Sequence, residues 1–285
     1  MSVASPSPAV LDTASIPADP LVASAQWLAQ HAVAAWALAC LLGWLGLAAW
    51  RAWSKRQPPA PRPKQLAAQA WRRLRWALPA LAGFAGLASQ IHPGQALQRF
   101  DAALAQALAD TVSRTTLQAF GALSWLGNPA PVSVLTVVVT LALLWRGQRW
   151  WAAGWLLGVL GNTLLNWSVK QVFARPRPPH GHGVVLETGY SFPSGHASGM
   201  WVTYGLLAWL LCQVCPPRWH ALILGGAATL VLSGPVSRVM LQVHYASDVL
   251  AGLCSGTVWL LVCLLWMDAR PGAAGTPAAA TPGPR

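Results

Sequence analysis

Long apolar segments separated by short polar ones are the feature that most limits how this chain can fold. Several of them approach the roughly 20 apolar residues that a helix needs to cross a bilayer. Only 9% of the 285 residues are charged, against about 25% in soluble domains. We therefore expect an all-α, polytopic membrane protein. Seven apolar segments run at about 25–50, 76–91, 131–145, 150–173, 196–214, 219–236 and 247–266.

These segments also divide the chain into parts. Residues 1–24 are rich in Ala, Pro and Ser and lack the basic start of a secretory signal, so we expect an uncleaved, disordered tail. Residues 269–285 have a similar composition and are expected to be disordered too. Between the tails, we expect an extra transmembrane helix with a basic loop at 25–75 and a six-helix bundle at 76–268.

The net charge of +12 is concentrated rather than spread. Eight of the 19 basic residues lie between Arg51 and Arg75, in one loop between apolar segments. Cytoplasmic loops of membrane proteins carry such an excess. With this loop inside, alternation places 13 basic residues in the cytoplasm and the amino terminus outside. The charge thus predicts membrane orientation, and we expect no nucleic-acid partner.

The region between the second and third apolar segments carries a helical pattern. Its apolar residues recur every three or four positions, which predicts an amphipathic helix. Two roles stay open: packing on the outer ends of the membrane helices, or lying in the interface and controlling lateral access of lipids. The apolar residues are Leu97, Phe100, Leu104, Leu108 and Val112.

A first polar motif closes the fourth segment. Lys170 and Arg177 are seven residues apart, and Pro176 and Pro178 end the helix there. Converging cations can bind phosphate oxygens, arginine with two donors and lysine as a point charge. The alternative is that they are snorkelling side chains at a membrane edge, a role we expect for Arg175.

A second motif opens the fifth segment with Pro193, Ser194, Gly195 and His196. Gly195 permits close backbone approach, and a helix start offers free N–H groups to an anion. Ser194 also suits a helix cap. His196 is either a structural histidine or a proton donor to a leaving oxygen.

A third motif joins the last two segments. Arg238 ends one, and His244 and Asp248 follow four residues apart, on one face of a helix. A carboxylate bonded to one imidazole nitrogen leaves the other as a nucleophile. Asp248 lies within an apolar segment, where carboxylates are usually functional. A His–Asp pair that only satisfies its own hydrogen bonds is the alternative.

Together the motifs Lys-x6-Arg-Pro, Pro-Ser-Gly-His and Ser-Arg-x5-His-x3-Asp resemble the type 2 phosphatidic acid phosphatase superfamily. That family includes lipid phosphatases, glucose-6-phosphatase and vanadium haloperoxidases. The resemblance covers about residues 76–266. It implies that His244 attacks phosphorus, Asp248 orients it and His196 protonates the leaving group. It also implies that the phosphate is held by Lys170, Arg177, Ser194, Gly195 and Arg238.

Acidic residues and cysteines limit the chemistry further. Only seven acidic residues occur, too few to assemble a carboxylate metal cluster, so we expect neither metal nor cofactor. The five cysteines lie in apolar segments, and the Cys212–Cys215 spacing lacks a second pair, so no zinc or redox site is expected. His180, Gly181, His182 and Glu187 are either solvated loop residues or contacts of a head group or a weakly bound metal.

These observations predict a metal-independent phosphatase of a lipid phosphate or diphosphate, acting through a phosphohistidine at the periplasmic face of a bacterial inner membrane. Undecaprenyl diphosphate is our first choice of substrate; phosphatidylglycerophosphate, phosphatidic acid and lipid A phosphate are alternatives. The expected partners are this substrate and membrane lipids, with no protein partner. Two other classes are a haloperoxidase, which the apolar segments argue against, and a non-catalytic scaffold or transporter subunit.

Overall fold

A computed structural model describes residues 19–54, 65–179 and 184–269. This part of the chain is helical, as the apolar pattern predicts. The two expected tails fall mostly outside it, as do His180, Gly181 and His182. Its helices are α1 (Pro20–Ser54), α2 (Gln65–Ser89), α3 (Ala96–Thr111), α4 (Arg114–Trp125), α5 (Pro129–Trp145), α6 (Arg149–Phe173), α7 (Gly195–Val214), α8 (Pro217–Met240) and α9 (Ala246–Asp268).

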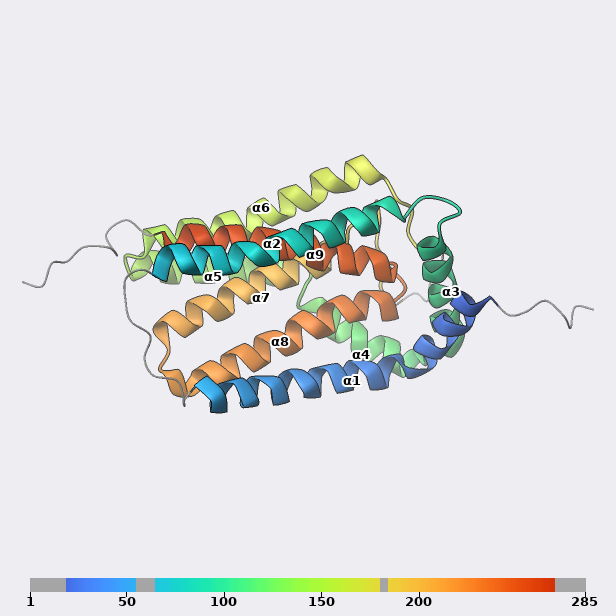
Figure 1. The fold of residues 1–285 in the computed structure, drawn as a ribbon, viewed down its shortest axis with the longest axis horizontal. Coiled ribbons are helices and arrows are strands. Elements are labelled where there is room, and N and C mark those ends of the chain that lie inside the picture. Colours follow the sequence, from blue (N-terminus) through green and yellow to red (C-terminus); the bar gives the residue numbers. More distant parts are fainter. Residues whose placement is uncertain (1–18, 55–64, 180–183, 270–285) are drawn as a thin grey trace, which may run out of the picture.

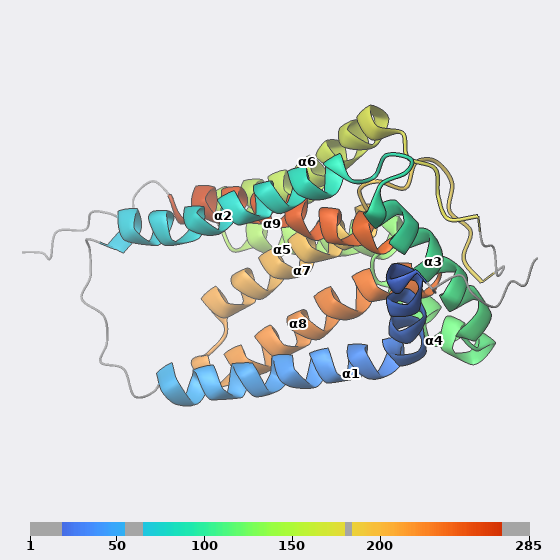
Figure 2. The same cartoon turned by 45° about the vertical axis from the view of Figure 1, so that its right-hand side comes forward.

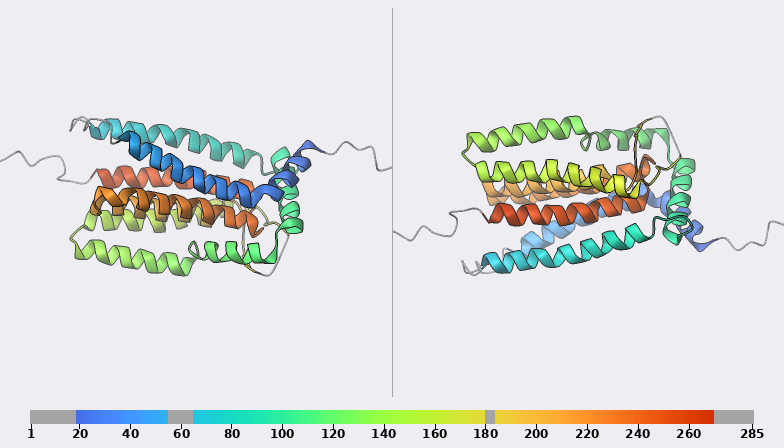
Figure 3. Two further views of the ribbon diagram at one scale, coloured as in Figure 1. Left: turned by 90° about the horizontal axis from the view of Figure 1, so that it is seen from below. Right: turned by 90° about the horizontal axis from the view of Figure 1, so that it is seen from above.

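Helices α1, α2 and α5–α9 run side by side as a bundle, and α3 lies across one of its ends (Figures 1 and 3). By length and composition, five stretches of the described chain can cross a membrane: α1, the stretch formed by α4 and α5, α7, α8 and α9. Helices α2 and α6 run alongside them (Figure 1). The expected all-α membrane bundle, a six-helix core of α2 and α5–α9 plus the extra α1, is confirmed.

Two boundaries differ from the expected ones. Helix α1 begins at Pro20, so residues 20–24 are helical and not part of a tail. Helix α2 begins at Gln65, within the basic stretch assigned to a loop. Proline is tolerated in the first turn of a helix, which explains the start of α1. Basic residues interrupt the apolar pattern of α2 without ending the helix, which explains the second shift. The remaining apolar segments begin and end within a few residues of α5–α9.

The amphipathic segment forms α3, and the structure favours its packing role. Leu104 and Leu108 are buried with Ala25 and Ala29 of α1 in one apolar cluster. The helix therefore closes the end of the bundle where α1 begins, as Figure 2 shows.

Helix α4 was not expected from the sequence. Ser113 caps it, because its side-chain oxygen accepts a hydrogen bond from the Thr116 N–H at 3.2 Å. Leu117 and Phe120, three residues apart, are buried against the same cluster. The cap and this spacing were the available signals. Helix α4 then turns into α5 at Leu126–Asn128, nearly end to end with it (Figure 3).

Close packing of α7 on α9 brings the second and third motifs together. A Cβ added to Gly252 of α9 would lie 2.5 Å from the Ser194 carbonyl oxygen, so only glycine fits there. The Ser194 N–H also donates to the Asp248 carbonyl at 2.9 Å. Because α6 and α8 end where α7 and α9 begin, all three motifs meet at the end of the bundle covered by α3 (Figure 1).

Candidate active site

Arg177 lies in the extended segment between α6 and α7 and reaches across to the third motif. Its Nη1 donates to the Val243 carbonyl at 2.7 Å and lies 3.1 Å from His244 Nε2. Its Nε and Nη2 donate to the carbonyls of Gly189 and Thr188, both at 3.1 Å. Partial burial lowers the pKa of the Arg177 guanidinium from its ordinary value. The structure thus brings the first motif into contact with the proposed nucleophile.

His244 lies in the turn between α8 and α9 and is buried. Its Nδ1 is 3.5 Å from Asp248 Oδ2, without the alignment of a hydrogen bond. Asp248 is held by other groups, since Oδ2 accepts from the Tyr245 N–H at 2.9 Å and Oδ1 from Arg175 Nη1 at 2.6 Å. Burial lowers the pKa of His244 to about 4, although Asp248 opposes this shift. A neutral imidazole therefore directs Nε2 toward Arg177.

Arg238, near the end of α8, is completely buried. Its Nη1 donates to Ser124 Oγ of α4 at 2.6 Å, and its Nη2 forms an ion pair with Glu187. Within the described residues, its Nε has no hydrogen-bond partner. A buried guanidinium with an unused donor is a strong anion-binding element.

Lys170 and the second motif complete the polar cluster. The Lys170 ammonium donates to the carbonyls of Tyr190 and Ser191. Ser194 is buried and caps α7, since its Oγ accepts from the Ala197 N–H at 3.3 Å. This hydrogen bond supports the alternative role of Ser194 as a helix cap.

His196 begins the first turn of α7 and lies close to the same space. Its Nε2 is 2.8 Å from Asn128 Oδ1, and Asn128 is the N-cap residue of α5, although its side chain does not cap that helix. A Cβ on Gly195 would lie 3.0 Å from Asn166 Oδ1, so glycine allows α6 to approach here.

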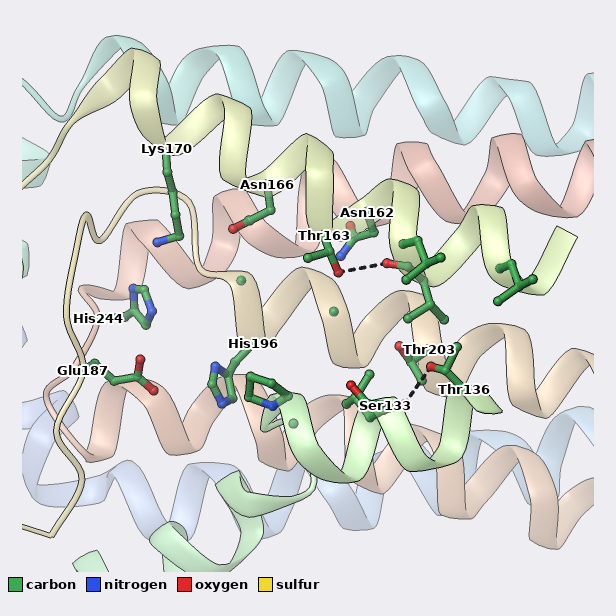
Figure 4. A pocket seen from close by; sticks show the side chains of 18 of the residues that line it. Ser133, Thr136, Asn162, Thr163, Asn166, Lys170, Glu187, His196, Thr203 and His244 are labelled. Atoms are coloured by element: carbon green, nitrogen blue, oxygen red, sulfur yellow. Dashed lines mark hydrogen bonds between the residues drawn. The ribbon is translucent and has the colours of Figure 1, made fainter. Parts of the chain in front are cut away.

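A cavity of about 640 Å³ joins these side chains to the interior of the bundle. Lys170, His244, Glu187 and His196 gather at one end of it (Figure 4). Arg177 and Gly195 also line the cavity. The rest extends between α5, α6 and α7. Apolar side chains line it, Val132, Val137, Leu156, Val159 and Leu160, and so do polar ones, Ser133, Thr136, Asn162, Thr163, Asn166 and Thr203 (Figure 4).

Arg175 contradicts its expected role. Instead of snorkelling at a membrane edge, it is buried and paired with Asp101 at 2.9 Å and Asp248 at 2.6 Å. It also donates to Ser247 Oγ at 2.7 Å and lies 4.2 Å from the centre of the Tyr245 ring. The prediction was wrong because the partner carboxylate comes from α3, which folds over this end of the bundle.

Sequence reasoning missed Asp101. Burial raises its pKa, while hydrogen bonds from Ser247 and Arg175 lower it. Asp101 shares a helix face with Leu104, Ala105 and Leu108, all of them buried. An acidic residue on the apolar face of an amphipathic helix was the signal for a buried ion pair.

Comparisons with known proteins agree with this geometry. Residues 150–271, which contain all three motifs, match the family model described as the PAP2 superfamily. Phosphatidylglycerophosphatase B of Bacillus subtilis is 29% identical over 175 residues, covering 60% of this chain and 84% of that protein. Human dolichyldiphosphatase 1 is 32% identical, over 48% of this chain and 59% of its own length. Lipid A 1-phosphatase of Rhizobium etli is 31% identical, over 41% of this chain and 48% of its own length.

A solved structure has the same fold. The crystal structure of a transmembrane PAP2-type phosphatidylglycerolphosphate phosphatase from Bacillus subtilis superimposes with a TM-score of 0.62 at 25% identity. The match covers 66% of this chain and 94% of that one. Family model, relatives and fold thus point the same way: the chain carries a PAP2 superfamily domain at residues 150–271, the domain of the membrane phosphatases that it resembles.

Proposed function

We propose that this protein is a metal-independent phosphatase of lipid phosphates or diphosphates that acts through a phosphohistidine on His244. The cavity carries the proposal, because it combines two kinds of surface. Cations and histidines gather at one end, and apolar side chains of α5 and α6, interspersed with polar ones, line the remainder. A phosphate and an attached apolar chain need this combination.

The cluster supports a two-step mechanism. Lys170, Arg177 and Arg238 hold the phosphate and neutralise its charge, which supplies most of the catalysis in phosphoryl transfer. His244 Nε2 forms a bond to phosphorus while the bond from phosphorus to the leaving oxygen breaks. His196 donates a proton to that oxygen. Asp248 then stabilises the positive charge on the phosphorylated imidazole.

Water completes the cycle. It attacks phosphorus, the bond from phosphorus to His244 Nε2 breaks, and inorganic phosphate leaves. His196, deprotonated in the first step, takes the proton from this water and returns to its starting state. His244 Nε2 lies 3.1 Å from Arg177 Nη1, so its lone pair faces a proposed phosphate-binding cation. The scheme needs no metal, and activity is expected to survive EDTA.

Undecaprenyl diphosphate remains our first choice of substrate. Dolichyldiphosphatases among the relatives are named for a diphosphate carried on a long isoprenoid chain. Phosphatidylglycerophosphate is the second candidate, because both a curated relative and the solved neighbour are named for it. Lipid A phosphate and phosphatidic acid complete the set to be tested.

The site is proposed to face the periplasm or exterior. All three motifs lie at one end of the bundle, and α1 ends and α2 begins, with their basic residues, at the other (Figure 1). The positive-inside bias assigns that other end to the cytoplasm.

One experiment tests the function. Purified protein in detergent is assayed for phosphate release from undecaprenyl diphosphate, phosphatidylglycerophosphate, phosphatidic acid and lipid A. His244→Ala should abolish release, whereas His220→Ala, at the opposite end of α8, should not. A protein that releases no phosphate from any of them, or a His244→Ala variant that retains full activity, would contradict the proposal. The first result would favour a non-catalytic scaffold.

A further inference from the structure

One short segment, residues 187–191, binds all three cations of the proposed phosphate site through hydrogen bonds and an ion pair. The Lys170 ammonium bonds to the carbonyls of Tyr190 and Ser191. Arg177 bonds to the carbonyls of Thr188 and Gly189. The one side-chain anion in this segment is Glu187, and it reaches the third cation, Arg238.

The Glu187 carboxylate lies where an anionic ligand would bind. One oxygen pairs with Arg238 Nη2, and the other is 3.9 Å from Arg177 Nη2. The side chain lines the cavity together with Lys170 and His244 (Figure 4). Glu187 thus bridges two cations, as a phosphate would.

The unused donor of Arg238 sharpens this comparison. Arginine binds a tetrahedral oxyanion best through the edge formed by Nε and Nη2. Here Glu187 uses Nη2, while Nε lacks a partner among the described residues. The carboxylate therefore fills the edge only partly, and a phosphate could engage both donors.

Other carboxylates cannot replace Glu187 in this position. Asp248 is held by Arg175 and by the Tyr245 N–H. Asp101 is held by Arg175 and Ser247. A buried guanidinium without an anion is costly, and in this structure Glu187 balances the charge of Arg238.

We propose that Glu187 is an internal occupant of the phosphate site, which an incoming phosphate must displace from Arg238. This inference rests on the proposed function, because it takes Lys170, Arg177 and Arg238 as phosphate ligands. Glu187 and phosphate compete for Arg238 Nη2 and repel each other. The apparent affinity for phosphate is then reduced by the fraction of molecules in which Glu187 holds the site. Glu187 thereby limits the affinity for substrate and for the phosphate product alike.

The test compares Glu187→Gln with the unmodified chain. Inorganic phosphate and orthovanadate are the probes, because they need only the anion site and no lipid tail. Glu187→Gln should lower the inhibition constants of both by about tenfold, as expected if Glu187 occupies the site in about nine molecules of ten. Asp110→Asn is the matched control: it removes one exposed carboxylate at the same end of the bundle, and should leave both constants unchanged.

A graded variant excludes a merely structural role. Glu187→Asp keeps the charge but shortens the side chain, so its constants should fall between those of the unmodified chain and Glu187→Gln. Unchanged or weaker inhibition in Glu187→Gln, with an unfolding temperature like that of the unmodified protein, would overturn the proposal. So would a Glu187→Asp variant that binds both anions more weakly than the unmodified chain.

Direct binding separates this inference from the proposed function. Calorimetric titration of inorganic phosphate into His244→Ala and into His244→Ala with Glu187→Gln requires no turnover. The double variant should bind phosphate about tenfold more tightly. That result would support the inference even if no lipid is hydrolysed, while equal affinities would overturn it even if the unmodified protein is an active phosphatase.

Discussion

Two neighbouring charged regions at the same end of the bundle differ in how their arginines are partnered. The first, the clamp, consists of Arg175 with Asp101 and Asp248. Side chains of α3 and α9 fill its donors and cover its face. The second, the proposed anion site, consists of Lys170, Arg177 and Arg238. Backbone carbonyls, the Ser124 hydroxyl and Glu187 contact it in the described structure, and we propose that a ligand can replace Glu187.

Charge balance explains the difference. The clamp has two carboxylates for one guanidinium, so it has no capacity for a further anion. The anion site has three cations and one carboxylate, and so keeps an excess of positive charge beside the cavity. A buried arginine alone does not identify a binding site. What identifies one is whether fixed carboxylates already balance the positive charge.

The largest effect is expected from breaking the clamp. Arg175→Met leaves Asp101 and Asp248 buried without a cation, which should destabilise the fold by about 3–5 kcal/mol and abolish activity. Thermal unfolding in detergent measures the loss. Arg99→Met, which removes an exposed pair with Asp19, is the control and should change little. A clamp variant as stable as this control would refute a structural role for Arg175.

Arg238→Lys should distinguish the two regions experimentally, because it changes the anion site and leaves the clamp intact. Lysine keeps the charge but cannot present two donors on one edge. We expect kcat/KM to fall about a hundredfold, corresponding to about 3 kcal/mol of transition-state stabilisation. The unfolding temperature should fall far less than in Arg175→Met. Activity within a factor of three of the unmodified protein would argue against phosphate binding by Arg238.

A smaller effect is expected at Asn128, whose Oδ1 lies 2.8 Å from His196 Nε2. Without it, His196 loses a partner that orients the ring, so Asn128→Ala should lower kcat about tenfold at similar KM. The fall in kcat should be smaller with p-nitrophenyl phosphate as the substrate, because a good leaving group needs little protonation. An equal loss on both substrates would contradict a positioning role through His196.

The smallest effect concerns pH and stability. The pKa of His244 is lowered to about 4 in the fold, below the about 6.5 of an unfolded chain. Protonation therefore favours unfolding, and the stability that neutral His244 provides is present above pH 6.5 and lost as pH falls toward 4. The unfolding temperature should drop more between pH 7.5 and 5 for the unmodified protein than for His244→Asn. Parallel drops would contradict a buried neutral imidazole.

The proximity of Lys170, Arg177 and His244 was easier to predict from the sequence than the clamp. Lys170, Arg177 and His244 stand at the ends of apolar segments, and alternation of helices across a membrane brings such ends together. Asp101 and Arg175 pair only because α3 folds over the bundle, and no local pattern specifies that contact. Glu187 lies in an extended segment without periodicity, so its position depends on the tertiary fold alone.

The central claim is that His244 carries the phosphoryl group during turnover. The most direct measurement is rapid alkaline quenching of the enzyme with a lipid substrate labelled with ³²P at the departing phosphate. We expect label bound to the protein that is stable to alkali, labile to acid and absent from His244→Ala. Turnover without such label, or label that persists in His244→Ala, would contradict the account.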